Sequence, residues 1–218
     1  MRRLLIPFAA VLLVATSALS LAQCSKAPAA PPASDYQLIG TVHDIMEGIV
    51  DPSSDVLFDA VATDITAAGV NEKRPQTDEE WKTVESNALM LAEAANLLKM
   101  PGRIAANPGD KTKSEGPDAP ELTPAEIQAK IDADRGKWLK FATNLQEQAR
   151  KTHDAAKRKD ADAVFALGED IDMACEDCHL EYWYPNDAAA KASALQAKAD
   201  REKERQQKAA EAAQQQKK

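Results

Sequence analysis

The chain has 218 residues, a net charge of −8 and 5% aromatic residues, and alanine and charged residues dominate it. This composition favours helices over sheets, and the length suits one domain once a leader and tether are removed. The leader carries +2 and residues 188–218 carry +4, which leaves −14 on residues 23–187. So acidic a body argues against nucleic-acid binding and favours partner proteins with a basic docking face.

Residues 1–22 have the organisation of a signal peptide. A basic pair, Arg2 and Arg3, precedes an apolar stretch that ends in small residues up to Ala22. Because the apolar run is short for a membrane-spanning helix, we expect cleavage and export to a bacterial periplasm. Residues 23–35 then form an Ala/Pro tether.

Cys24 has two interpretations. The run Leu21-Ala22-Gln23-Cys24 resembles a lipoprotein box, which predicts a lipid anchor on this cysteine. Cleavage after Ala22 would instead leave Cys24 as a free thiol near the mature N-terminus. The mature protein is accordingly either tethered to a membrane by a lipid or soluble in the periplasm.

Residues 36–186 form the predicted domain, and its first helix is expected over residues 35–50. Leu38, Val42, Ile45 and Ile49 make a one-face apolar stripe there. Pro52 is expected to break this helix. A further helical stretch is expected over residues 55–68, ended by Gly69.

Three more helices follow. The second begins at the capping box Thr77–Glu80 and ends at Pro101, and residues 102–122 are expected to be a surface loop. The third begins at the capping box Thr123–Glu126, and polar Asp134 interrupts its apolar stripe. The fourth is expected over residues 160–180. Four amphipathic helices indicate an all-α four-helix bundle, followed by a charged tail, residues 187–218, that is helical or disordered.

The fourth helix carries the most specific motif, Cys175-Glu176-Asp177-Cys178-His179. This C-x-x-C-H run is the attachment signature of a c-type haem. Two thiols bind the porphyrin covalently, and the adjacent histidine supplies an imidazole to the iron. Helical spacing turns both sulfurs inward and puts His179 one turn from Cys175. The sequence therefore predicts one covalent haem c.

Other uses of the motif fit the sequence less well. A thioredoxin-like site would adjoin a βαβ pattern, and a structural zinc site needs four ligands. The chain has three cysteines and three histidines, and one of the cysteines is Cys24. A disulfide between Cys175 and Cys178 would leave His179 without a role.

An exported chain with four helices and one C-x-x-C-H on the last of them resembles the cytochrome c-prime family, the class II c-type cytochromes. The resemblance covers about residues 36–184 and is specific at Cys175, Cys178 and His179. It implies that the first helix faces the distal side of the haem. In that family the low-spin members place a methionine there, whereas the high-spin members leave the iron five-coordinate.

Met46 is the candidate sixth ligand, because it lies on the first helix and a thioether suits haem iron. It could instead be a core methionine that fills a gap. His43, one turn earlier, is the rival ligand, and Met90, Met100 and Met173 are weaker candidates. His153 is expected to be exposed. The tryptophans are expected to pack in the core or on the haem, and Tyr182 and Tyr184 to pack near the proximal side.

These features predict a periplasmic one-electron carrier with a haem held by His179 and Met46, and not an enzyme. The alternative is a five-coordinate haem protein that binds or senses NO or CO. The spin state of the ferric iron separates the two. A homodimer is compatible with either function.

Overall fold

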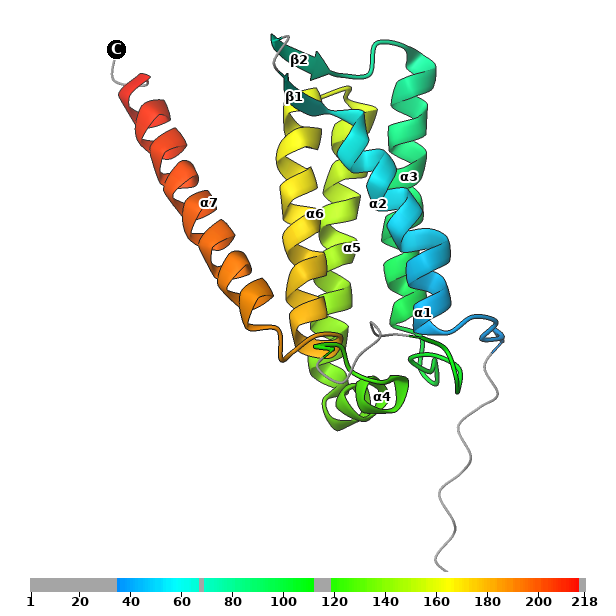
Figure 1. Ribbon diagram of the computed structural model, residues 1–218. Helices are drawn as coiled ribbons and strands as arrows, with labels where there is room; N and C mark the ends of the chain where they lie inside the picture. Colours follow the sequence, from blue (N-terminus) through cyan, green and yellow to red (C-terminus); the bar gives the residue numbers. More distant parts are fainter. Residues whose placement is uncertain (1–34, 67–68, 112–118, 216–218) are drawn as a thin grey trace, which may run out of the picture. The chain divides into compact units, whose positions relative to one another are not determined.

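The computed structural model describes residues 35–66, 69–111 and 119–215. The predictions of a signal peptide, a tether and a lipidated Cys24 lie outside these residues. The chain divides into a short unit, residues 1–37, and a larger unit, residues 38–218. The larger unit is mostly helical with one small sheet, in line with the expected all-α class (Figure 1).

A nearly continuous helical segment opens the larger unit. It comprises α1 (Val42–Ile45), a π-helical turn η1 (Met46–Val50) and α2 (Asp51–Ala60). A capping box begins it: Asp44 N donates to Thr41 Oγ1 (3.1 Å), and Thr41 N donates to Asp44 Oδ2 (2.8 Å). The predicted start at residue 35 is therefore wrong, because this capping box places the first turn at Val42.

The predicted break at Pro52 is also wrong. Pro52 lies in the first turn of α2, directly after the π-helical turn. A π turn changes the hydrogen-bond register, so a proline that lacks an N–H can follow it without ending the helix. The helix consequently continues past Pro52 to Ala60.

The helix expected over residues 55–68 gives way to a hairpin after Ala60. Strands β1 (Ala62–Thr66) and β2 (Gly69–Lys73) pair antiparallel, with Ala62 opposite Lys73. Three of the five residues of β1 are β-branched, and such residues favour extended backbone over helix. Gly69, the first residue of β2, has φ 130°, a conformation that favours glycine, but the helix has already ended at Ala60.

The two capping boxes found in the sequence are confirmed at the starts of α3 (Asp78–Leu98) and α4 (Pro124–Ala133). The third predicted helix is, however, two helices, because α5 (Arg135–Lys157) begins after a break at Asp134. Asp134 leaves helical geometry at φ −143° and ψ 76°, and its Oδ1 accepts a hydrogen bond from Lys137 N at 2.8 Å. The aspartate that interrupts the apolar stripe is thus the cap of the next helix.

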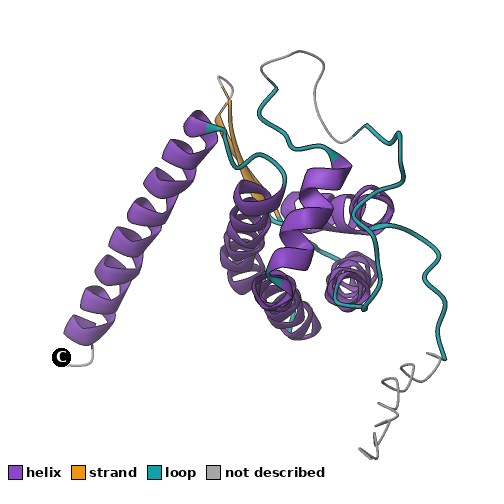
Figure 2. Ribbon diagram, turned by 90° about the horizontal axis from the view of Figure 1, so that it is seen from below, coloured by secondary structure: helices purple, strands orange, loops and turns teal. Residues whose placement is uncertain are grey.

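The fourth predicted helix is confirmed as α6 (Ala161–Tyr182), which Asp160 caps through a 3.0 Å bond from Ala163 N. The long helices α3, α5 and α6 run side by side, and α2 crosses them (Figure 1; seen nearly end on in Figure 2). Between α3 and α5, fully buried alanines let the backbones approach closely: Ala88, Ala95 and Ala149. The larger apolar side chains of the four segments form one core.

The loop after α3 is only partly the surface connection that the sequence predicts. Arg103, Ala105 and Ala106 are buried at its start. The N–H groups of Val42 and His43, which have no partner inside α1, donate to the Ile104 and Ala105 carbonyls at 2.9 Å. This stretch of the loop therefore holds the beginning of α1 in place.

The tail forms a helix, α7 (Ala188–Gln215), that begins near the end of α6 and whose side chains are mostly exposed. The contacts between α6 and α7 are made by charged side chains. None of the helices in the described ranges is long and apolar enough to cross a membrane.

Candidate functional site

Two adjoining cavities lie between the π-helical turn and α6. Five residues line both of them: Met46, Asp51, Trp138, Cys178 and His179. Cys175 lines the first cavity, and His43 lines the second. The structure thus brings together all four residues that the sequence assigns to a haem.

The thiols of Cys175 and Cys178 sit one turn apart on α6 and pack against the core. Both are free, so the disulfide weighed in the sequence analysis is not formed. Burial, helped by acidic neighbours such as Asp172, raises the pKa of Cys175 to about 12, and burial likewise raises the pKa of Cys178 to about 12. The folded chain therefore holds both sulfurs as neutral thiols.

His179 follows on the same face of α6. Burial lowers the pKa of its imidazole, and the nearby Asp51 carboxylate opposes that shift. A neutral imidazole has a free lone pair, which is the state that binds a metal. Burial of His179 thus favours the neutral imidazole, the form that binds a metal.

Aromatic rings surround His179 on the chain that follows the motif. Trp183 lies edge-on to the imidazole with centroids 5.1 Å apart, and the Tyr184 ring is 5.8 Å away. Tyr184 Oη donates to Glu176 Oε2 at 2.6 Å, which fixes the ring against α6. These contacts restrict the orientation of the imidazole.

Met46 lies at the first position of the π-helical turn and is half-buried. It shares both cavities with His179, whereas His43 lines only the second. The His43 Nε2 atom also lies 3.3 Å from Glu47 Oε1. This placement favours Met46 over His43 as the distal ligand, and the assignment stays a prediction.

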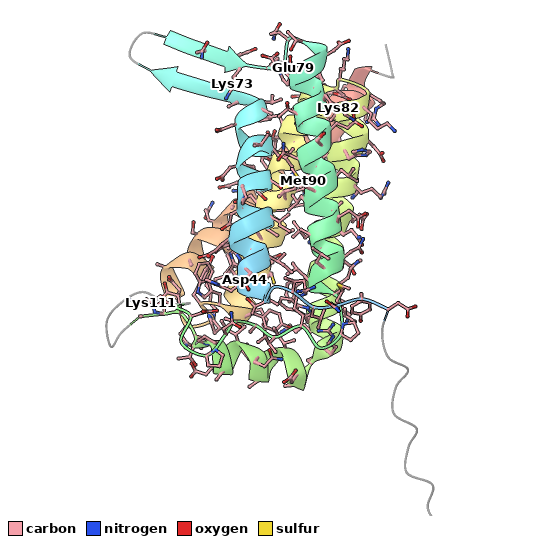
Figure 3. All side chains as sticks on the ribbon, turned by 90° about the vertical axis from the view of Figure 1, so that its right-hand side faces the viewer. Asp44, Lys73, Glu79, Lys82, Met90 and Lys111 are labelled. Carbon is pink, nitrogen blue, oxygen red and sulfur yellow. The ribbon has the colours of Figure 1, made fainter. Side chains whose placement is uncertain are left out.

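The other methionines in the described ranges line neither cavity. Met90 is 45% exposed, part-way along α3 (Figure 3). The Met100 sulfur instead accepts a hydrogen bond from Arg103 Nη2 at 3.3 Å.

His153 is half-buried, not exposed as predicted. Its Nε2 atom lies 3.7 Å from Glu85 Oε1 of α3. His153 is half-buried because α3 packs closely on α5. It lines neither cavity.

Sequence reasoning missed four polar residues that line the first cavity: Asp51, Ser54, Asp55 and Asp172. Ser54 is buried, and its Oγ has no hydrogen-bond partner among the described residues. The Oη of buried Tyr182, which lines the second cavity, is unpartnered in the same sense. An unpaired buried hydroxyl costs about 1–3 kcal/mol. Buried hydroxyls without a partner are expected where a bound ligand supplies the missing hydrogen-bond partner.

One wall of the first cavity is apolar and suits a large flat cofactor, whereas charged side chains line other parts of both cavities. Trp138 packs edge-on against Tyr182 with ring centroids 5.2 Å apart, and Trp138 Nε1 donates to the Leu98 carbonyl at 2.9 Å. Phe141 and Leu145 complete this wall of the first cavity. An imidazole, a thioether, two free thiols, an apolar wall and two unpartnered hydroxyls together fit a haem with polar edges.

In the described part of the chain, no three His, Cys, Asp or Glu side chains gather as they would around a bare metal ion. Neither a protein-family model, nor a curated protein, nor a solved structure matches this chain.

The raised thiol pKa values have a measurable consequence in the chain prepared without haem. At pH 8, which lies well below about 12, both folded thiols remain protonated and only the thiolate reacts. We expect iodoacetamide to alkylate Cys175 and Cys178 about a hundredfold more slowly in the folded chain than in urea. Peptide mass spectrometry against time measures this, and equal rates would contradict the burial of the thiols.

Proposed function

We propose that this protein is a periplasmic c-type cytochrome that carries one electron, with a haem on Cys175 and Cys178 and with His179 and Met46 as axial ligands. One observation carries the proposal: the C-x-x-C-H residues of α6 and Met46 of the π-helical turn line one pair of adjoining cavities. The resemblance to class II cytochromes c, stated from the sequence, supports the same assignment.

In this proposal the helical segments form a four-helix bundle. Its members are the α1–α2 segment, α3, α5 and α6, and α4 is an additional short helix before α5. Such bundles hold cofactors between side chains of facing helices. Here α6 supplies the attachment residues, and the crossing α1–α2 segment supplies the distal residue.

A bound haem would supply a one-electron couple at its iron. The chain would contribute covalent attachment, two axial donor atoms and a shield against water. Cys175 and Cys178 would keep the group attached in both oxidation states. His179 and Met46 would donate a nitrogen and a sulfur, and Trp138 with its apolar neighbours would exclude water. None of these residues is assigned a catalytic role, so the protein is proposed not to be an enzyme.

The proposed place of action is the bacterial periplasm, because the predicted leader directs export and c-type haem is attached there. A lipid on Cys24 would tether the protein to a membrane, and the acidic body would attract basic redox partners.

The decisive experiment is the intact mass of protein matured in a strain that assembles c-type cytochromes. We expect one haem that survives acid–acetone extraction, because two thioether bonds hold it. Replacing both cysteines with serine (Cys175→Ser, Cys178→Ser) should abolish that retention. A haem lost from the wild-type chain on extraction would overturn the proposal.

A second candidate function is the binding or sensing of NO or CO at a five-coordinate iron. The unpartnered Ser54 hydroxyl in the cavity that Met46 lines favours it, because a buried donor can hydrogen-bond a small polar ligand. The spin state of the ferric protein distinguishes this function from electron transfer.

A further inference from the structure

Helices α6 and α7 have opposite charge. Helix α6 contains seven acidic residues and no lysine or arginine. Helix α7 carries the cations of the tail, among them Lys198, Arg201 and Arg205. Opposite charge on two neighbouring helices favours their association, and the effect weakens as salt is added.

Arg201 makes the central contact between them. Its Nη2 atom lies 2.9 Å from Asp170 Oδ1 and 3.3 Å from the Ala166 carbonyl oxygen, and its Nε lies 3.5 Å from Glu169 Oε2. The side chain is only 16% exposed. Few side chains on α7 are this well covered, so Arg201 anchors the helix.

Two further ion pairs extend the contact along α6. Arg205 Nη2 lies 3.4 Å from Asp170 Oδ1, and Lys198 pairs with Asp177. Asp177 stands between the two cysteines of the motif. Glu169, Asp170 and Asp177 form an acidic surface, here called the α6 acidic face, that adjoins the motif in sequence.

Apolar packing contributes little to the contact. Leu195, the largest aliphatic side chain of α7, is 68% exposed. Ion pairs near a surface stabilise only weakly, and salt screens them. Helix α7 is thus held by a few weak bonds that another cationic surface can replace.

We propose that the α6 acidic face is the docking surface for a basic protein partner, and that α7 is a tethered competitor that covers this face until the partner displaces it. Helix α7 already shows that a cationic helix can bind the α6 acidic face. The inference stands apart from the haem, because it rests on ion pairs that involve neither the thiols nor His179.

The test compares two full-length variants with the same net charge. Arg201→Gln with Arg205→Gln removes two cations that face α6. Lys203→Gln with Lys208→Gln removes two cations whose pairs lie within α7, with Asp200 (3.0 Å) and Glu204 (2.6 Å). The probe is a fluorescent oligolysine, whose binding at low salt is followed by anisotropy. We expect the first variant to bind the probe about five- to tenfold more tightly than the second.

Adding Asp170→Asn to the first variant should remove most of this gain, because it takes away the acidic group that the released helix exposes. Carbodiimide cross-linking of Lys198 to Asp177, read by mass spectrometry, reports the docked helix directly. We expect this cross-link to fall with salt and in the Arg201→Gln, Arg205→Gln variant, but not in the lysine control. Equal probe binding by the two variants, or a gain that survives Asp170→Asn, would overturn the proposal.

Discussion

Met46→Ala is expected to turn a low-spin holoprotein into one with a high-spin ferric haem that binds CO. Met46 is the methionine of the described ranges that lines both cavities with His179, so in the proposed holoprotein its removal would leave the iron without a distal ligand from this helix. Loss of a methionine ligand should also lower the reduction potential. Absorption, EPR and potentiometry of the purified holoprotein measure these changes.

The same substitution should leave the fold largely intact. Met46 is half-buried, so truncating it should cost about 1–2 kcal/mol, at or below the low end of the range for buried methionine. Circular dichroism and urea unfolding separate this loss of packing from the loss of a ligand. Met90→Ala is the matched control, because that side chain is exposed on α3 and lines neither cavity (Figure 3).

Two results would contradict the assignment, each in a different way. A wild-type protein that is already high-spin and binds CO makes Met46 a core residue and favours the gas-binding function. A low-spin spectrum that survives Met46→Ala points to His43, which lines the second cavity. His43→Ala then becomes the variant to test.

Local signals in the sequence predicted the helices wherever a cap or a periodic stripe was complete. The capping boxes at Thr77 and Thr123 mark the starts of α3 and α4, and the C-x-x-C-H run lies on α6 as expected. Each signal is contained within a few adjacent residues, so it does not depend on the packing of distant segments.

The features of the fold and of the site that the sequence did not predict depend on tertiary structure or on weaker local signals. The π-helical turn gives the chain after Met46 a different register from a regular helix, and Asp51 thereby comes to line both cavities. A 3.6-residue periodicity cannot predict that placement. The hairpin was missed although its β-branched residues were a usable signal, because the stretch was assigned to the preceding helix. The break at Asp134 was visible only as a polar interruption.

Arg103 illustrates a structural role that sequence patterns do not reveal. It lies in a Gly/Pro-containing loop, yet it is only 6% exposed. Its Nε donates to the Leu97 carbonyl at 2.8 Å near the end of α3, and its Nη1 donates to the Gly40 carbonyl just before α1. A cation at the C-terminal end of a helix is favoured by the helix dipole. The guanidinium thus joins α3 to the start of the helix that carries Met46.

Arg103→Ala is expected to lower the free energy of unfolding by about 2–4 kcal/mol, because it leaves buried carbonyls without their donor. Arg103→Lys should recover only part of this loss, since an ammonium lacks the forked geometry that reaches both carbonyls. Arg150→Ala is the matched control: the Arg150 side chain is 61% exposed, and among the described residues its ion pair is with Asp154 in the next turn. That change should cost no more than about 0.5 kcal/mol.

Carbonyl groups of the loop beside Arg103 also accept hydrogen bonds from the first N–H groups of α1. If the loop loosens, the start of α1 should shift, and with it the distal side of the site. We therefore expect Arg103→Ala to broaden or shift the haem spectrum of the holoprotein toward that of Met46→Ala, while Arg150→Ala leaves it unchanged. Urea unfolding and the absorption spectrum test the two effects separately. A loss of stability with an unaltered spectrum would mean that Arg103 supports the fold without positioning Met46. An Arg103→Ala protein as stable as the Arg150→Ala control would show that the buried guanidinium does not join α3 to α1.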